Sequence, residues 1–186
     1  MKALDSEAIE TITLARRTGL AWLATLLVGM SGALALGQGI DINLSADVES
    51  VAVAMLNAET RLRALAYVGL LVFALDLLVS LGLFLLLKQT GLLLAAWCLT
   101  ARLMGALLSV LSAVFLMNAA EIASRPAYTV LADRADRILL NGLQATSNYT
   151  SFHLSIVLSS AALAGVCYLF LKSGAVSDTH LRALVS

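Results

Sequence analysis

Four long stretches of almost uninterrupted apolar residues alternate with polar segments along the chain. Each stretch is close to or longer than the roughly 20 residues that an α-helix needs to cross the hydrocarbon core of a bilayer. Leucine, alanine and valine follow one another without the polar–apolar alternation of membrane β-strands. The pattern therefore predicts an all-α integral membrane bundle of four transmembrane helices. We expect a single membrane domain over 1–186, with spans at about 18–37, 64–87, 92–117 and 152–171.

The first polar outer segment, 38–60, has the pattern of a short amphipathic helix. Ser45 is placed to cap a helix over 46–57, because a serine oxygen accepts hydrogen bonds from the free N–H groups of a first helical turn. One side of this helix is apolar and consists of Val48, Val51, Met55 and Leu56. The segment therefore predicts an interfacial or lid-like helix.

The second polar outer segment, 119–147, predicts another short helix after a break. Pro126, the one proline of the chain, ends the third span because proline lacks a backbone N–H. A helix is expected over 128–144, with Asp133 and Arg137 paired at i, i+4 on its polar side. Its apolar side consists of Leu131, Ala135, Ile138 and Leu139.

Small residues recur along the first and third spans. Such stripes let helix backbones approach closely, which is how helices associate in lipid. We therefore expect close packing and a contact with a second copy or a larger membrane complex. A cleavable signal peptide is the competing interpretation of the first span, on the Ala33-Leu34-Ala35 sequence. The stripes consist of Ala21, Thr25, Gly29, Ala33 and Gly37, and of Ala95, Cys98, Arg102, Ala106, Ser109 and Ala113 with Gly105 alongside.

Two charged residues lie deep inside the second and third spans, Asp76 and Arg102. Each is equally far in sequence from Gln89 in the turn between the spans, so an antiparallel helix pair puts both at one depth. An unpaired charge at a helix centre costs about 2.5–3.5 kcal/mol on insertion scales. The spacing therefore predicts an intramembrane ion pair. The pair either fixes the register of the hairpin or lines a polar cavity for a ligand, a proton or an ion.

Composition narrows the class of protein. Of the 186 residues, 60% are hydrophobic and 13% charged, and the net charge is zero. A soluble domain is nearer one quarter charged, so the chain has too little polar surface for water and its expected partner is the lipid bilayer. A nucleic-acid partner is excluded because no basic stripe exists. Cys98 and Cys167 lie in apolar runs and are expected to pack there, so neither a metal nor a cofactor is predicted.

A group of polar residues marks the fourth span. His153 and Tyr149 lie at i, i+4 near its outer end, and a polar stripe follows its first half. Either His153 is simply hydrogen-bonded there, or it contacts a ligand or a proton at a cavity mouth. No catalytic residue is assigned, since no Ser-His-Asp or Cys-His arrangement can be argued. The stripe consists of Asn148, Ser151, Ser155 and Ser159.

Orientation follows from the basic residues near the span ends. Segments on the N-terminal side of the membrane carry an excess of lysine and arginine, and those on the other side an excess of aspartate and glutamate. We expect both termini in the cytoplasm. The Ala/Leu-rich composition favours a bacterial inner membrane, so the two glycosylation-type sequences at Asn43 and Asn148 are interpreted as coincidental.

Several short motifs together resemble a known family. The chain from about 15 to 172 is similar to the bacterial integral-membrane family catalogued as domain of unknown function 4386. The resemblance implies that Asp76, Arg102 and His153 are recurrent polar positions. Members carry an acidic residue where this chain has Gly105, and they run on into further membrane helices. The motifs are Ala15-Arg16-Arg17-Thr18-Gly19-Leu20, Ala46-Asp47, Ala54-Met55-Leu56-Asn57, Arg61-Leu62-Arg63, Leu75-Asp76-Leu77-Leu78-Val79, Ala101-Arg102-Leu103 and Phe152-His153-Leu154.

Three functions remain open from the sequence. The favoured one is a non-enzymatic module that binds a small ligand or lipid, or serves as an accessory subunit. The second is a proton- or solute-coupled transporter that uses Asp76 and Arg102. The third is a membrane enzyme with an outward-facing site at His153. The candidate ligand- or ion-binding residues are Asp76, Arg102, His153, Tyr149, Ser155 and Ser159.

Overall fold

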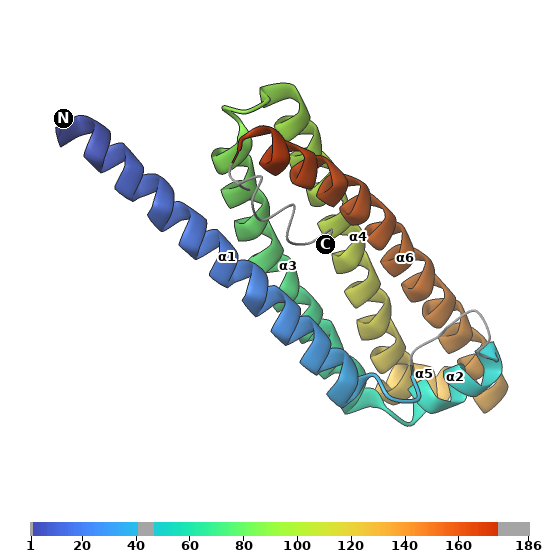
Figure 1. Ribbon diagram of the computed structural model, residues 1–186. Coiled ribbons are helices and arrows are strands. Elements are labelled where there is room, and N and C mark those ends of the chain that lie inside the picture. The colour runs from blue at the N-terminus through green and yellow to red at the C-terminus, as the bar shows by residue number, and fades with distance from the viewer. Residues whose placement is uncertain (1, 41–46, 175–186) are drawn as a thin grey trace, which may run out of the picture.

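The computed structural model describes residues 2–40 and 47–174, and within them the chain is helical without any strand. This confirms the all-α fold class. The helices are α1 (Lys2–Leu36), α2 (Val48–Leu56), α3 (Glu59–Leu87), α4 (Leu92–Ser124), α5 (Pro126–Leu131) and α6 (Arg134–Lys172). Figure 1 shows α2 and α5 together at one end of the bundle, the α2–α5 end, and the turn between α3 and α4 at the other, the hairpin end.

Four of these helices are long and apolar enough to cross a membrane: α3, α4, α6 and the 9–36 part of α1. The predicted integral membrane protein with four spans is therefore confirmed. The long helices follow one another in a row, because α4 packs on both α3 and α6 while the main contacts of α1 are with α3 (Figure 1). The core of the hairpin end lies between α3, α4 and α6 and includes Val79, Cys98 and Val166.

The helix boundaries match the predictions at the hairpin and differ elsewhere. Helix α3 ends at Leu87 and α4 begins at Leu92, as expected. Helix α6, in contrast, runs unbroken from Arg134 to Lys172, so the separate helix predicted over 128–144 was wrong. The start of the fourth span at 152 stays a prediction, since a membrane span can begin inside a longer helix. The helix continues because its polar residues find partners on α4: Asn148 donates to the Ser112 carbonyl at 2.9 Å. Polar side chains that are paired across an interface give no reason for a helix to end.

The break between α4 and α6 lies at Pro126, as predicted. Arg125 is extended and Pro126 is the first residue of α5, where its missing N–H has no helical partner to lose. The predicted pair of Asp133 with Arg137 is wrong. Asp133 instead caps α6 by accepting the backbone N–H of Asp136 at 2.8 Å, and Arg137 donates to the Ala123 carbonyl at 3.1 Å.

Helix α2 begins at Val48, slightly later than expected. The Asp47 carboxylate accepts the backbone N–H groups of Glu49 and Ser50 at 3.2 and 3.3 Å and so provides the N-cap. Ser45, the predicted cap, lies outside the described residues. Helix α2 packs on α6 and α4, with Val51 and Met55 buried as predicted, so this end of the bundle has its own core.

Helix α1 packs on α3 through small residues, as its stripe predicted. A Cβ at Gly32 would lie 2.6 Å from a methyl of Val68, and the space at Gly82 is filled by Thr18. Of the predicted stripe, Ala21, Thr25 and Gly29 are half-buried and Gly37 is buried, whereas Ala33 is exposed and its place is taken by the buried Gly32.

The C-terminal end of α1 is fastened by a side chain from α3. The Arg61 guanidinium donates to the Leu36 carbonyl at 3.1 and 2.8 Å and also to the Gln38 carbonyl. A cation that binds the free carbonyls of a last helical turn also opposes the negative end of the helix dipole.

Candidate functional site

The two intramembrane charges meet as the sequence predicted. The Arg102 guanidinium pairs with the Asp76 carboxylate through its Nη2, while its Nε donates to the Ser80 hydroxyl at 2.9 Å. That hydroxyl in turn donates to the backbone carbonyl of Asp76 at 2.6 Å. Only 6% of Arg102 is exposed. Ser80, one turn from Asp76 on α3, therefore completes a small hydrogen-bonded network between α3 and α4.

Little free space surrounds this network. The hollow beside Arg102 and Ser80 has a volume of about 10 Å³. That is no more than a single water molecule needs. Apolar side chains such as Leu83, Cys98 and Leu169 form its walls. In this arrangement the pair fills its own space and holds α3 and α4 in register.

The serine stripe of α6 faces α4 and is used for packing. The hydroxyls of Ser109 and Ser155 are 2.7 Å apart, and a Cβ at Gly105 would lie 2.7 Å from the Ser159 hydroxyl. A larger side chain at position 105 would therefore push α6 away from α4. This contact explains why a glycine fits where the resemblance led us to expect an acidic residue.

His153 lies apart from the ion pair. Its Nδ1 is 2.8 Å from the Tyr149 carbonyl, and the rings of His153 and Tyr149 are 3.8 Å apart between centroids. The ring of Phe152 meets it edge-on at 5.7 Å. His153 is exposed, whereas Arg102 and Ser155 are buried between helices. The structure thus divides the six candidate residues into an inner pair, an α4–α6 seam and an exposed aromatic group.

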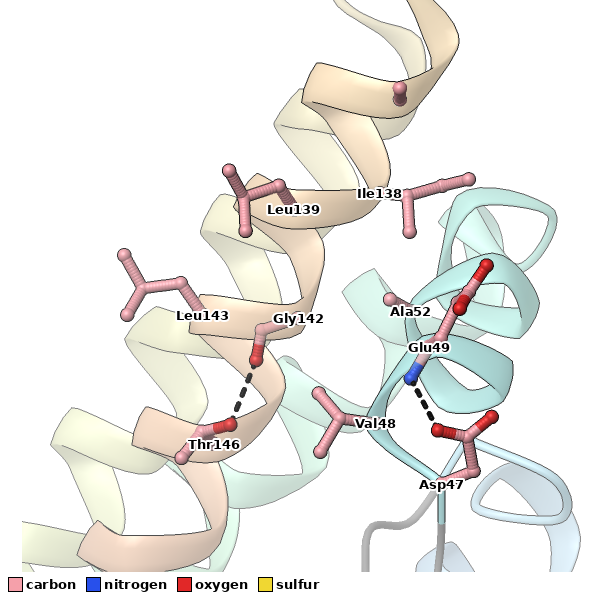
Figure 2. Close-up of a pocket in the computed structure, with 10 residues that line it drawn as sticks. Asp47, Val48, Glu49, Ala52, Ile138, Leu139, Gly142, Leu143 and Thr146 are labelled. Carbon is pink, nitrogen blue, oxygen red and sulfur yellow. Dashed lines mark hydrogen bonds between the residues drawn. The ribbon is translucent and has the colours of Figure 1, made fainter.

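A groove of about 700 Å³ lies at the α2–α5 end, between α2 and α6. Figure 2 shows Ile138 projecting from α6 on the side of α2, and Leu139 and Leu143 projecting from α6 on the side away from α2. Helices α2 and α6 approach closely at its base, where a Cβ at Gly142 would lie 3.3 Å from Val48. The groove is lined by Asp47, Val48, Glu49, Ala52, Ala135, Ile138, Leu139, Gly142, Leu143 and Thr146.

The polar residues of the groove differ in what they already bind. Asp47 is occupied by capping α2, and the Thr146 hydroxyl donates to the Gly142 carbonyl at 3.0 Å (Figure 2). Glu49 lies in the first turn of α2 and projects from the α2 wall (Figure 2). Within the described part of the chain its carboxylate forms no hydrogen bond or ion pair.

Contacts between the helices place the groove relative to the membrane. Arg63 is the last charged residue before the apolar run of α3, so the hydrocarbon core ends near it. Its guanidinium pairs with Glu121 of α4 at 2.8 Å, and Asn118, about one turn earlier, donates to Gln144 of α6 at 3.4 Å. Gln144 therefore lies about one helical turn deeper than Arg63, and the groove extends along α6 from near Gln144 past the end of the apolar run of α3.

The sequence predicts the apolar residues that line the groove but not the packing of α2 beside α6 that forms it. The apolar side predicted for the second outer helix included Ala135, Ile138 and Leu139, and that of the first included Val48. What the pattern could not show is that the two sides face each other across a gap. Leu139 and Leu143 remain 74% and 60% exposed, since α2 does not cover them.

Comparison with known proteins completes the picture. No curated protein and no solved structure matches the chain. One family of proteins does match, over residues 17–179, which is most of the chain and includes α3, α4, α6 and the second half of α1. The resemblance found in the sequence motifs is thereby confirmed, and the chain belongs to the family described as Domain of unknown function (DUF4386).

Proposed function

We propose that the protein is a non-enzymatic membrane module that binds a lipid or similar amphiphile in the groove between α2 and α6. The observation that carries this proposal is the groove itself, which has a volume of about 700 Å³ and is walled mainly by apolar residues. Its place beyond the apolar run of α3 supports a position among the lipid headgroups. Ligand pockets are commonly of this size and mostly apolar, with a few polar groups. The Asp76–Arg102 pair then has a structural role, because the hollow beside it is too small for a ligand.

Two exposed leucines make an amphiphile the natural occupant. Leu139 and Leu143 are one helical turn apart on α6 and lie on the same side of that helix. An acyl chain that packs on them removes their apolar surface from water, at roughly 25 cal/mol for each Å² buried. A small polar solute gains nothing from these side chains.

The proposed setting is a bacterial inner membrane with both termini in the cytoplasm. The excess of basic residues in the segments at the hairpin end supports this orientation. The groove would then face the periplasmic leaflet, and its occupant would come from that leaflet.

The test counts the phospholipids that remain bound after purification. Leu139→Trp fills the groove from its open side, and Leu131→Trp is the matched control, since Leu131 is 85% exposed on α5 and does not line the groove. Native mass spectrometry of the full chain in mild detergent should show one retained lipid in the wild type and in Leu131→Trp. That lipid should be lost from Leu139→Trp. Equal retention in the two variants would refute the proposal.

A further inference from the structure

We infer that the groove selects a lipid whose headgroup carries a primary ammonium group, and that Glu49 binds this group. This inference rests on the proposed function and adds the class of lipid. Two carboxylates, Asp47 and Glu49, line the groove, and no lysine, arginine or histidine of the described residues does. The charge of the groove is therefore complementary to a cationic headgroup and repels an anionic one.

Glu49 is the carboxylate that remains available. The oxygens of Asp47 already accept two backbone N–H groups of α2, at 3.2 and 3.3 Å. The Glu49 carboxylate has no such partner among the described residues. A primary ammonium has N–H groups to donate, and hydrogen bonds between two charged groups are about twice as strong as neutral ones. A quaternary ammonium has the charge but no N–H to donate.

The depth of Glu49 matches that of a headgroup amine. Glu49 and Ile138 line the same groove from opposite walls (Figure 2). Ile138 lies about 9 Å beyond Gln144 along α6, given a rise of 1.5 Å per residue. The headgroup layer extends about 5–8 Å beyond the hydrocarbon core on each side. Since Gln144 lies about 4.5 Å inside the level of Arg63, Ile138 lies about 4.5 Å beyond it. A lipid amine at Glu49 thus lies within that layer, and its acyl chain points back toward the bilayer.

The apolar wall continues from the amine position to the hydrocarbon boundary. From Ile138 and Leu139 the wall passes Leu143 and reaches Thr146, beside Gln144. The Thr146 hydroxyl already donates its proton to the Gly142 backbone carbonyl, so it has no further proton to donate to an occupant. A lipid therefore finds a carboxylate at one end of the groove and a continuous apolar surface toward the other, in the order that its own headgroup and chain require.

The experiment titrates the delipidated full chain in detergent with three phospholipids that share the same acyl chains. They carry ethanolamine, choline and glycerol headgroups, and native mass spectrometry measures each dissociation constant. Glu49→Gln removes the charge and keeps the shape of the side chain. Glu10→Gln is its control, since Glu10 is an exposed carboxylate on α1, far from the groove. Leu139→Trp is measured beside them.

We expect the ethanolamine lipid to bind the wild type most tightly, and Glu49→Gln to weaken that lipid alone by about threefold to tenfold, as for a partly exposed ion pair. Equal binding of all three lipids, weakened only by Leu139→Trp, would overturn the headgroup selection and leave the proposed function standing. If the choline and ethanolamine lipids bind the wild type equally and Glu49→Gln weakens both, the groove recognises any cationic headgroup and the preference for a primary ammonium is refuted. If Leu139→Trp binds every lipid as the wild type does, or instead dissociates a dimer of the chain, the groove holds no lipid and both proposals fail.

Discussion

Replacing the intramembrane ion pair by leucines separates a structural role from a functional one. Asp76→Leu leaves the Arg102 guanidinium buried between α3 and α4, with the Ser80 hydroxyl as its remaining partner. Arg102→Leu leaves the Asp76 carboxylate without a cation, at a site where 19% of its side chain is exposed. Breaking a buried pair by removing one partner costs about 3–5 kcal/mol. Each single variant should therefore lose that much stability.

The double variant should recover almost all of the loss. Two apolar side chains of similar volume often replace a buried pair without loss, or with a gain of about 1–4 kcal/mol. Asp76→Leu/Arg102→Leu is thus expected within about 1 kcal/mol of the wild type or above it. The charge swap, Asp76→Arg/Arg102→Asp, should recover less. It restores the attraction but misplaces the guanidinium relative to Ser80, whose hydroxyl accepts its Nε at 2.9 Å.

The assay is reversible unfolding in a mild detergent, followed by circular dichroism as a denaturing detergent is added. The coupling between the two positions is the difference between the summed single losses and the loss of the double variant, and we expect it to be several kcal/mol. A double variant whose loss equals the sum of the two single losses would show that the residues do not act as a pair. A stable double variant that no longer retains lipid would assign the pair a role beyond the register of the hairpin.

Three further predictions follow from other contacts, each measured as a change in melting temperature. Gly105→Ala should lower the stability by about 1–3 kcal/mol, because the added methyl group clashes with α6. Gly19→Ala is its control and should be neutral or slightly stabilising, since a Cβ there has nothing within 4 Å. Equal losses of stability in the two variants would contradict the close packing at Gly105. Arg61→Leu should cost about 1.5–3 kcal/mol because the last carbonyls of α1 lose a charged donor, and Arg61→Lys should restore part of it. Asn141→Leu should raise the melting temperature, because this buried amide makes no hydrogen bond with the described residues. Asn148→Leu should lower the melting temperature, because the Asn148 amide donates to the Ser112 carbonyl of α4. Shifts of the same sign in the two variants would refute this reasoning.

The hairpin was predictable because its information is local. The distances of Asp76 and Arg102 from one short turn fix their relative depth, whatever the rest of the bundle does. The limits of α3 and α4 at that turn follow from the same segment, where Lys88 and Gly91 interrupt the apolar run. Small residues on α4 likewise marked a buried face, and Ala95 and Ala113 are buried as predicted.

The groove and the outer helices depend on contacts between distant segments. Gln144 and Asn148 resemble the end of a helix in sequence, yet both are paired with α4 and lie inside α6. Asp47 and Ser45 are both good caps, and the pattern alone does not rank them. The position of α2 against α6 is set by the close approach at Gly142, which no periodicity reveals. The pattern of apolar residues therefore predicts two separate apolar sides and not the hollow between them.

The edge position of α1 has a consequence for how the protein assembles. Its main interface is with α3, and the core between α3, α4 and α6 is complete without most of its residues. Helices in lipid insert first and associate afterwards. We therefore expect α1, although synthesised first, to dock last, and to be the first cooperative unit to open in native-state hydrogen exchange. The rest of the bundle, and the groove with it, would persist through such openings.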